Sequence, residues 1–291
     1  MHIITDSGST KCDWIAMDNS GEQLFKARTM GLNPAILSAE ELVRRIKDSS
    51  DLLEHKNDIE SIHFYGAGCG TENPRLMLKG ILLDLFPNAK VKVDEDTLAA
   101  VRATVGENSG VVCILGTGSN CSYYDGERLH QRVVSLGYSI MDDASGNWFG
   151  RQLLRDYYFK RSPEEFREAF GKAFNVDADY IKEQLYKSEH PNAYLASHAS
   201  FIFEHVDTKY IKKLMRKGFK LFSKNMILQF KDVLDSEKVY FAGSIAYFGK
   251  EQLHAVADEM GFEIGGITRR PIEGLMAYHQ NLLRGNSLAW D

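Results

Sequence analysis

The sequence of 291 residues has few cysteines and prolines and no long apolar segment. Its four cysteines form no Cys-x-x-Cys pair, which excludes the common zinc motifs and argues against a disulfide framework. No apolar run approaches the about 20 residues needed to cross a bilayer, and Met1-His2-Ile3 does not begin a basic and apolar leader. We therefore expect a reduced, cytoplasmic protein.

Two signatures of nucleotide or nucleic-acid binding are also missing. The P-loop pattern Gly-x-x-x-x-Gly-Lys-Ser/Thr does not occur in the chain. The formal net charge is −5, and the lysines and arginines are scattered along the sequence instead of forming a basic stripe. We therefore expect neither a nucleic-acid partner nor a membrane partner. The length is enough for two domains, each with a sizeable core.

A tight turn between two strand-like runs near the N-terminus is the most informative segment. The apolar run His2-Ile3-Ile4 leads into Asp6-Ser7-Gly8-Ser9-Thr10-Lys11, after which an extended pattern resumes. The glycine allows close backbone approach, the hydroxyl side chains can donate to phosphate oxygens, and Asp6 can hold a hydrated divalent cation. Turns rich in Ser, Thr and Gly are also common without any ligand, so this segment alone is weak evidence.

A second turn of the same kind follows about a hundred residues later. The apolar run Gly110-Val111-Val112-Cys113-Ile114-Leu115 leads into Gly116-Thr117-Gly118-Ser119-Asn120, and another strand pattern follows. Each turn leads to a strand and not to a helix, which distinguishes both from a dinucleotide-binding fingerprint. The sequence therefore contains an internal repeat, and two such turns could clamp a polyphosphate from both sides.

Local patterns predict the main elements of the N-terminal half. Three strands are expected within residues 1–28, two of them joined by the hairpin turn Asp18-Asn19-Ser20-Gly21. Ser38-Ala39-Glu40-Glu41 predicts a capping box before an amphipathic helix that reaches about Leu53. Further strands are expected at 62–65 and 91–93, with a helix at about 75–85 between them.

With these motifs the chain resembles the N-acetylglucosamine kinase branch, also called the BadF/BadG/BcrA/BcrD ATPase family, of the acetate and sugar kinase–actin superfamily. The resemblance covers nearly the whole chain and rests on an ordered set of motifs. The set begins with the two phosphate turns and the segment Gly31-Leu32-Asn33-Pro34. It continues with the strand end and helix start at 91–100 and with the stretch 141–150, which is similar to the family's Gly-Asp-Glu-Gly-Ser-Gly. The adenosine motif at 239–246 is the last.

The resemblance implies an α/β fold of two actin-like, ribonuclease H-like domains with a cleft between them. We expect the N-terminal domain at residues 1–105, joined by a C-terminal helix at about 271–291. The C-terminal domain is expected at 106–270, with a helical insertion at 148–234. No linker rich in Pro, Gly or Ser divides the halves, so the boundary is inferred from the repeat.

The resemblance also implies a phosphoryl-transfer site that uses ATP and Mg²⁺. In the family, the aspartate at the place of Asp96 accepts the proton of a sugar 6-hydroxyl. The alternatives are that Asp96 only caps a helix, or that Asp94 or Glu95 has this role. Asp6 is expected to hold the metal. The residues expected to bind the nucleotide are Gly8, Ser9, Thr10, Lys11, Gly116, Thr117, Gly118, Gly243 and Ser244; those expected to contact the sugar are Asn33, Ser119, Asn120, Gly137 and Asp142.

Simpler interpretations remain open for several of these residues. Lys11 could point to solvent, Asn33 could be a turn residue before a proline, and Gly243 could belong to a plain strand-to-helix turn. The family's Gly-Asp-Glu-Gly is Met-Asp-Asp-Ala here, at 141–144. This departure leaves N-acetylmuramate, glucosamine or another hexosamine as alternatives to N-acetylglucosamine. The oligomeric state is left open between monomer and homodimer.

Two other functional classes of proteins are similar to the same superfamily and are alternatives to a kinase. An ATPase activator of 2-hydroxyacyl-CoA dehydratases would carry a cysteine followed by Ala-Ala-Gly-Thr-Gly and an Asp-Ile-Gly-Gly-Gln-Asp turn, and neither occurs, although Cys69 lies between two glycines. A kinase-like sugar sensor would carry a helix-turn-helix extension, and this chain begins directly at its first strand. We therefore expect an ATP-dependent kinase of an amino sugar, N-acetylglucosamine at its 6-hydroxyl.

Overall fold

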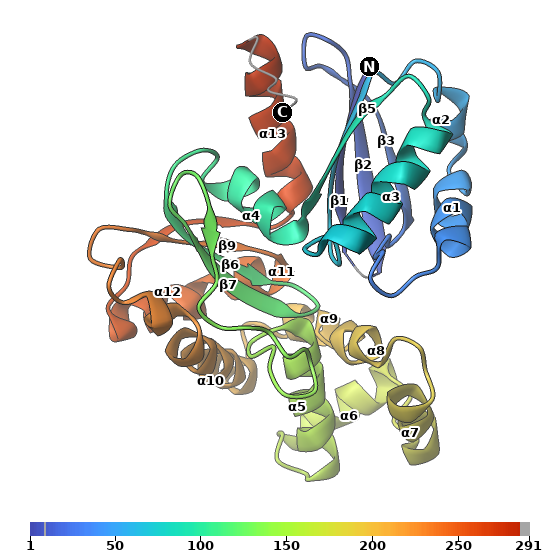
Figure 1. Cartoon of the computed structure of the whole chain (residues 1–291). Helices are drawn as coiled ribbons and strands as arrows, with labels where there is room; N and C mark the ends of the chain where they lie inside the picture. Colours follow the sequence, from blue (N-terminus) through green and yellow to red (C-terminus); the bar gives the residue numbers. More distant parts are fainter. Residues whose placement is uncertain (9, 286–291) are drawn as a thin grey trace. The chain divides into compact units, whose positions relative to one another are not determined.

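The computed structural model describes residues 1–8 and 10–285. Ser9, one of the residues expected to bind nucleotide, lies outside the described residues. The chain divides into two compact units (Figure 1). The first unit consists of Met1–Glu107 and the C-terminal segment that begins at Arg270, and the second unit is Asn108–Arg269. Within the described ranges, no helix combines the length and the apolar character that a membrane span requires.

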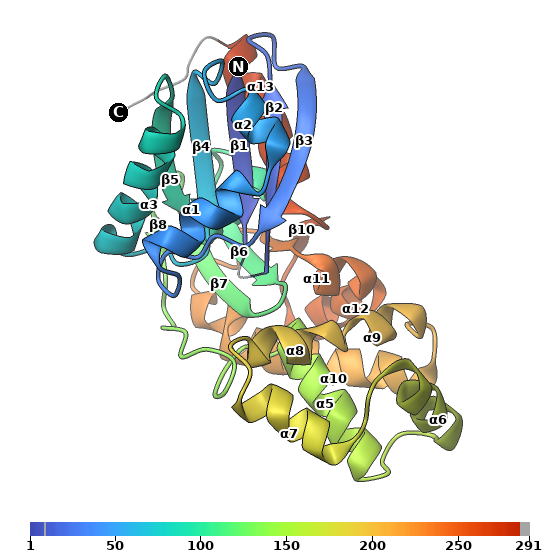
Figure 2. The same ribbon diagram turned by 90° about the vertical axis from the view of Figure 1, so that its right-hand side faces the viewer.

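The first unit is a five-stranded mixed sheet with helices on both faces. Its strand order is β3-β2-β1-β4-β5; β1 to β3 are antiparallel neighbours, and β1, β4 and β5 are parallel. Figure 2 shows β4, β1, β2 and β3 side by side. The strands are β1 (His2–Ser7), β2 (Lys11–Met17), β3 (Gln23–Met30), β4 (Ser61–Gly66) and β5 (Lys90–Glu95). The helices are α1 (Ala39–Lys47), α2 (Ser50–Glu54), α3 (Glu72–Leu85), α4 (Asp96–Thr104) and α13 (Pro271–Arg284).

Alternating side chains of β1 and β2 build a core on each face of this sheet, because successive residues of a strand point to opposite sides. Ile3 and Trp14 pack with side chains of α1 and α3. Their neighbours Ile4 and Ile15 pack with side chains of α4 and α13 on the opposite face (Figure 1). The end of β1, where the first phosphate turn begins, is therefore held from both sides.

The single helix expected from Ser38 to about Leu53 is wrong, because the structure contains two helices there. Ser38 caps α1 as predicted, with its Oγ accepting from the N–H of Glu41 at 3.3 Å. The helix then ends at Lys47, and Ser49 adopts an extended conformation before α2 begins. The run Asp48-Ser49-Ser50 lies at the break and consists of residue types with low helix propensity, although Ser49 makes no side-chain capping bond.

The second unit repeats the topology of the first. Its sheet order is β10-β9-β6-β7-β8, in which β6, β7 and β8 are antiparallel neighbours and β6, β9 and β10 are parallel. This is the internal repeat that the two turns predict. The strands are β6 (Gly110–Leu115), β7 (Ser119–Tyr124), β8 (Leu129–His130), β9 (Val239–Ala242) and β10 (Ile264–Thr268).

A group of helices lies between β8 and β9 in the sequence of the second unit. Both views show α6, α7 and α8 grouped around α5 (Figures 1 and 2). The helices of the unit are α5 (Gly146–Tyr158), α6 (Glu164–Ala173), α7 (Ala178–Tyr186), α8 (Pro191–Ser197), α9 (Ser200–Glu204), α10 (Lys209–Asn225), the 3₁₀ turn η1 (Ile227–Phe230), α11 (Ser244–Phe248) and α12 (Lys250–Met260).

The expectation that basic residues are scattered is wrong for α10. Seven of its 17 residues are Lys or Arg and none is acidic. These residues recur every three or four positions, so the helix brings them to one side, where they line a hollow of about 760 Å³. Two carboxylates of α12 neutralise part of this charge: Glu251 pairs with Lys212, and Glu259 pairs with Lys220.

Candidate active site

The carboxyl ends of three parallel strands bring the predicted catalytic and metal residues to one edge of the first sheet. The register pairs Ser7 of β1 with Gly66 of β4, and Gly66 with Glu95 of β5. Asp6 directly precedes Ser7 on β1, and Asp96 directly follows Glu95 of β5, so both are next to this row of paired residues. The two carboxyl groups interact: burial raises the pKa of Asp6 to about 7, with a further contribution from the negative charge of Asp96.

Asp96 has the environment of a proton acceptor. Glu95 occupies the N-cap position of α4 without a side-chain capping bond, and Asp96 is the first residue of the helix. Backbone N–H groups of Asp96 and Thr97 bond the Asp96 carboxylate, so Asp96 also makes a helix-capping contact. Burial raises the pKa of Asp96 to about 6, and the neighbouring carboxylate of Glu95 raises it further in the same direction. A carboxylate with such a pKa can exchange protons near neutral pH.

The first phosphate turn is closed by its own backbone. The N–H of Gly8 donates to the carbonyl of Lys11 at 2.9 Å, so residues 8 and 11 face each other across the turn. The ammonium of Lys11 lies 3.3 Å from Oδ2 of Asp13, and Oδ1 of the same carboxylate accepts a hydrogen bond of 2.6 Å from Nε of Arg28. Lys11 is therefore paired along the strand and half exposed.

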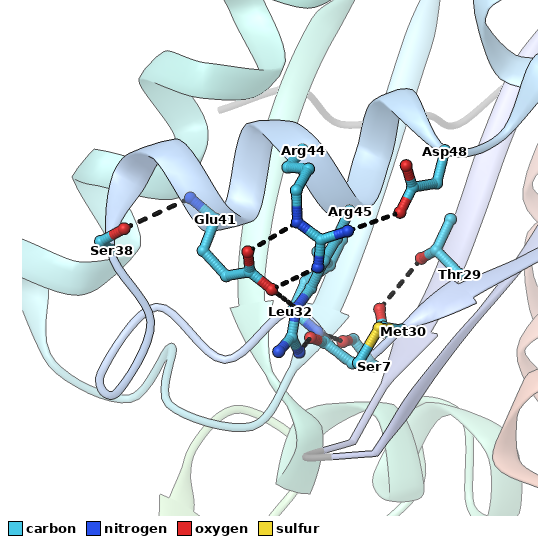
Figure 3. Close-up of polar contacts among 10 residues, drawn as sticks. Ser7, Thr29, Met30, Leu32, Ser38, Glu41, Arg44, Arg45 and Asp48 are labelled. Atoms are coloured by element: carbon cyan, nitrogen blue, oxygen red, sulfur yellow. Dashed lines mark hydrogen bonds and ion pairs between the residues drawn. The ribbon is translucent and has the colours of Figure 1, made fainter.

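A short loop that carries Asn33 is attached to the end of β1. The N–H of Leu32 donates to Oγ of the buried Ser7 at 2.9 Å, and Figure 3 shows both side by side. Oδ1 of Asn33 accepts from the N–H of Ala35 at 3.0 Å, so this oxygen stabilises the turn before and around Pro34, as the simpler interpretation expects. Among the described residues, the side-chain N–H₂ group of Asn33 makes no hydrogen bond.

Gly68 is a residue of this site that sequence reasoning missed. It has a φ of +81°, and a Cβ at this position would overlap Oδ1 of Asn33. A side chain is therefore excluded both by the backbone conformation and by the neighbouring amide. The signal was present as a run of glycines, Gly66-Ala67-Gly68-Cys69-Gly70, directly after a buried strand.

The second phosphate turn is held by the start of α5. The N–H of Gly116 donates to the carbonyl of Gly118 at 3.0 Å and closes the turn. The carbonyl of Gly116 accepts from the N–H of Gly146 at 2.7 Å, and that of Thr117 accepts from the N–H of Asn147 at 3.0 Å. The helix start and the turn therefore form one rigid piece.

Asp142 lies directly over this turn. A Cβ on Gly118 would come within 2.8 Å of a carboxylate oxygen of Asp142. The same oxygen accepts a hydrogen bond of 2.9 Å from the side-chain amide of Asn147, which is 1% exposed. Asn147 is thus a second residue that sequence reasoning missed. The other half of the acidic pair, Asp143, instead accepts from Asn225 at 2.8 Å.

The adenosine motif abuts the same turn. Gly243 has a φ of +125°, and a Cβ there would overlap the carbonyl of Leu115 and lie 3.2 Å from the N–H nitrogen of Gly116. The N–H of Gly243 donates to the carbonyl of Thr268 at 2.9 Å, and Ser244 follows as the first residue of α11. The strand-to-helix turn is therefore packed against the second phosphate turn.

The remaining predicted sugar residues lie in the second unit. Ser119 and Asn120 begin β7, and Oδ1 of Asn120 accepts from the hydroxyl of Ser122 at 3.3 Å. Gly137 has a φ of +80° in a turn closed by the N–H of Met141 at 2.9 Å. No contact of Gly137 with the other predicted residues is seen in the described part of the chain.

Cys69 does not have the properties of a cluster ligand. Its side chain is buried, and burial together with the negative charge of Asp96 raises the pKa of its thiol to about 12. Over residues 1–8 and 10–285, no group of three or more His, Cys, Asp or Glu side chains could hold a metal ion by itself. A metal site of protein ligands alone is therefore not built within these ranges.

Comparison with known proteins gives the same fold. No protein-family model matches the chain. A structure from Porphyromonas gingivalis, named "Putative N-acetylglucosamine Kinase", is 33% identical, with a TM-score of 0.89 over 97% of this chain and 99% of that one. A structure of the same name from Chromobacterium violaceum is 16% identical, with a TM-score of 0.70 over 95% and 98%.

A glucokinase of the ROK family from Streptomyces griseus, in complex with glucose and AMPPNP, shares the fold at 13% identity, with a TM-score of 0.56 over 97% of this chain and 99% of that one. The match at 33% identity extends over almost the whole of both chains. The chain belongs to the N-acetylglucosamine kinase family, whose fold is that of actin-like sugar kinases.

Proposed function

We propose that this chain transfers the γ-phosphoryl group of ATP to the 6-hydroxyl of an amino sugar, with N-acetylglucosamine as the first candidate. The observation that carries the proposal is the pair Asp6 and Asp96 at the carboxyl edge of one sheet, where burial and mutual repulsion raise the pKa of Asp6. Phosphoryl transfer needs a group that accepts or orients the hydroxyl proton and a means of neutralising phosphate charge. The two carboxylates divide these tasks.

Asp96 is the proposed proton acceptor. Its pKa of about 6 keeps it mostly ionised at neutral pH while leaving it basic enough to take a proton as the oxygen attacks. Its place at the start of α4, on a strand end and not in a long loop, fixes the direction of the carboxylate. The proton therefore moves from the sugar hydroxyl to a carboxylate oxygen of Asp96.

Asp6 is the proposed partner of Mg²⁺. Magnesium usually keeps several waters and takes only one or two protein carboxylates together with substrate phosphates, so a single aspartate is enough. The crowding of Asp6 by the carboxylates of Asp96 and Asp13 favours a cation there. When bound, the metal supplies charge neutralisation for the phosphates.

The other residues of the site would bind and orient the two substrates. We assign the turns at Gly8 to Lys11 and at Gly116 to Gly118 to the phosphates, and the turn at Gly243 and Ser244 to the adenosine. We assign the sugar to the side-chain amides of Asn33 and Asn120, the hydroxyl of Ser119, the loop at Gly137 and the carboxylate of Asp142. Asn147 keeps that carboxylate in place, because its amide donates to it at 2.9 Å.

Product analysis tests the transfer and its position. The protein is incubated with Mg-ATP and N-acetylglucosamine, and the product is examined by ³¹P–¹H correlation NMR. We expect a phosphomonoester coupled to the protons at carbon 6, and no product from the 6-deoxy analogue. A phosphate on the anomeric carbon would contradict the assigned position, and absence of any phosphosugar would contradict the function.

A further inference from the structure

The loop Gly31-Leu32-Asn33 is fastened at each of its three residues. The N–H of Leu32 donates to Ser7, and Oδ1 of Asn33 accepts from the N–H of Ala35. The carbonyl of Gly31 accepts a hydrogen bond of 2.6 Å from the guanidinium of Arg45 (Figure 3). This third contact comes from α1 and ties the helix to the loop.

Arg45 is placed for this contact at an unusual position. It lies on the buried side of α1 with Leu42 and Ile46, and only 5% of its surface is exposed. A buried guanidinium needs partners for its charge and its N–H groups. Glu41 supplies the charge, with Oε1 at 2.7 Å from Nε, and the Gly31 carbonyl takes the N–H on Nη1.

The neighbouring Arg44 differs from Arg45 in its exposure and in its second partner. Arg44 also binds Glu41, at 2.7 Å, but its side chain is 54% exposed and its other ion pair is with Asp48 on the same helix. Figure 3 shows the ion pairs of Arg44 with Glu41 and Asp48. One arginine therefore belongs to the surface of the helix, and the other reaches the loop.

A displacement of Gly31 would be transmitted to Asn33. The side chain of Asn33 sits against Gly68, where no room is left even for a Cβ. Packing this close allows few arrangements of the loop, so its position is set by the contacts that pull it against the sheet. Arg45 is the charged member of those contacts.

We propose that Arg45, supported by Glu41, is a positioning residue that holds the Gly31-Leu32-Asn33 loop so that the amide of Asn33 meets the sugar. This proposal rests on the function proposed above. It assigns to α1 a role in sugar affinity, although no residue of α1 touches the substrate in this account.

The kinetic test compares Arg45→Met with Arg44→Met. Both changes remove one guanidinium from Glu41, but only the first frees the Gly31 carbonyl. We expect Arg45→Met to raise the KM for the sugar about tenfold with the KM for ATP unchanged, since small misplacements of binding groups have effects of this size or larger. Arg45→Lys, which keeps the charge and can donate, should recover part of the loss. Equal effects of Arg45→Met and Arg44→Met, or equal changes in both KM values, would overturn the proposal.

A double-mutant cycle with Asn33→Ala tests the route of the effect. If Arg45 acts through Asn33, adding Arg45→Met to Asn33→Ala leaves the sugar KM within about twofold of the single Asn33→Ala variant. Multiplication of the two separate effects would overturn the proposal. If Arg45→Met does not fold, the same comparison is read on Arg45→Lys and on Glu41→Gln.

Hydrogen exchange separates this proposal from the proposed function, because it needs no activity. The N–H of Leu32 is bonded to Oγ of Ser7 on β1, and the N–H of Ala35 is bonded to Oδ1 of Asn33. We expect their exchange to accelerate in Arg45→Met and not in Arg44→Met. Unchanged exchange would overturn the positioning role even in an active kinase. Accelerated exchange in a protein that phosphorylates no sugar would keep the positioning role and refute the function.

Discussion

Asp6 and Asp96 place two carboxyl groups where burial disfavours their charge. In both cases the folded-state pKa is raised above the ordinary value for aspartate, to about 7 and about 6. The folded protein therefore binds these protons more tightly than the unfolded chain. The stability contribution of such a group is present at low pH and is lost as the pH rises through the folded pKa. Near neutral pH, the buried carboxylates therefore lower the stability of the folded protein and are more basic than ordinary aspartates.

Replacing Asp96 by Asn should therefore stabilise the protein in a pH-dependent way. At pH 8 we expect Asp96→Asn to raise the free energy of unfolding by on the order of 1–2 kcal/mol, and at pH 4 by close to nothing. Urea denaturation at the two pH values measures this. The matched control is Asp84→Asn, an exposed aspartate of α3, which should change stability little at either pH. A gain of the same size at both pH values would contradict the raised pKa.

The same carboxylate predicts the pH dependence of turnover. The pKa of Asp96 is about 6, so kcat/KM for the sugar should be flat above about pH 7 and fall about tenfold per pH unit below about pH 6. Initial rates from pH 5 to 8.5 at saturating Mg-ATP give this profile. A profile without an acidic limb in this range would remove Asp96 from the role of base.

Single residues were predictable where the sequence presents them next to a strand end. The places of Asp6, Asp96 and the glycines of both turns at strand ends could be predicted from the pattern of apolar runs, whereas the choice of Asp96 over Asp94 and Glu95 came from the resemblance, and the roles of these residues stay predictions. Arg45 could not be predicted, since its partner Gly31 is 14 residues away and meets it only in the folded loop. Asn147 lies only five residues from its partner Asp142, but nothing in the local pattern shows which side chain that carboxylate would contact. Asn147 in particular looks like an ordinary residue of a helix start.

Among the elements, the packing of β9 and α11 against β6 depends on one glycine. Gly243 combines a φ of +125° with a backbone contact that excludes a Cβ. Gly261, the αL cap of α12, also has a positive φ, of +76°, but open space around the Cβ position. An alanine at Gly261 would therefore suffer only from the positive φ, whereas an alanine at Gly243 would suffer from the positive φ and from steric overlap.

We expect Gly243→Ala to destabilise the protein by about 3 kcal/mol or more and to raise the KM for ATP, because the second phosphate turn must move. Gly261→Ala should cost only about 1 kcal/mol, the usual price of a left-handed alanine, and leave both KM values unchanged. Thermal melts and ATP titrations of the two variants test this. Equal behaviour of the pair would show that the contact with β6 is unimportant.

Element boundaries were less predictable than element types. The strands of the first unit could be predicted from alternation, whereas the break between α1 and α2 falls at Asp48-Ser49-Ser50, a polar run that also fits a helix surface. The basic side of α10 was also not predicted from the sequence. Its lysines are separated in the sequence and gather only on the folded helix.

At the scale of the whole molecule, the same sheet topology occurs twice and presents a phosphate-type turn in each unit. The repeat of strand, turn and strand predicted this, because the order of elements follows from hairpins and parallel crossovers. The packing of α13 on α4 and β1 of the first unit connects the two ends of the chain and has no comparable local signal.

The cysteines give a test of the fold that covers both units. All four are free and buried: Cys12, Cys69, Cys113 and Cys121. We expect none to react with Ellman's reagent within minutes in the native protein, and all four to react in denaturant. The purified protein should also be colourless. A reactive native thiol, or a brown iron–sulfur colour, would support the ATPase-activator alternative through Cys69.

Sugar kinase activity and the role of Asp96 are tested together by ADP release from Mg-ATP with a panel of sugars, measured for the wild type and for Asp96→Asn. The panel contains N-acetylglucosamine, N-acetylmuramate, glucosamine, N-acetylmannosamine and glucose. We expect strong turnover on one amino sugar and a loss of about a thousandfold or more in kcat for Asp96→Asn. Turnover independent of any sugar, or unaffected by Asp96→Asn, would contradict this expectation.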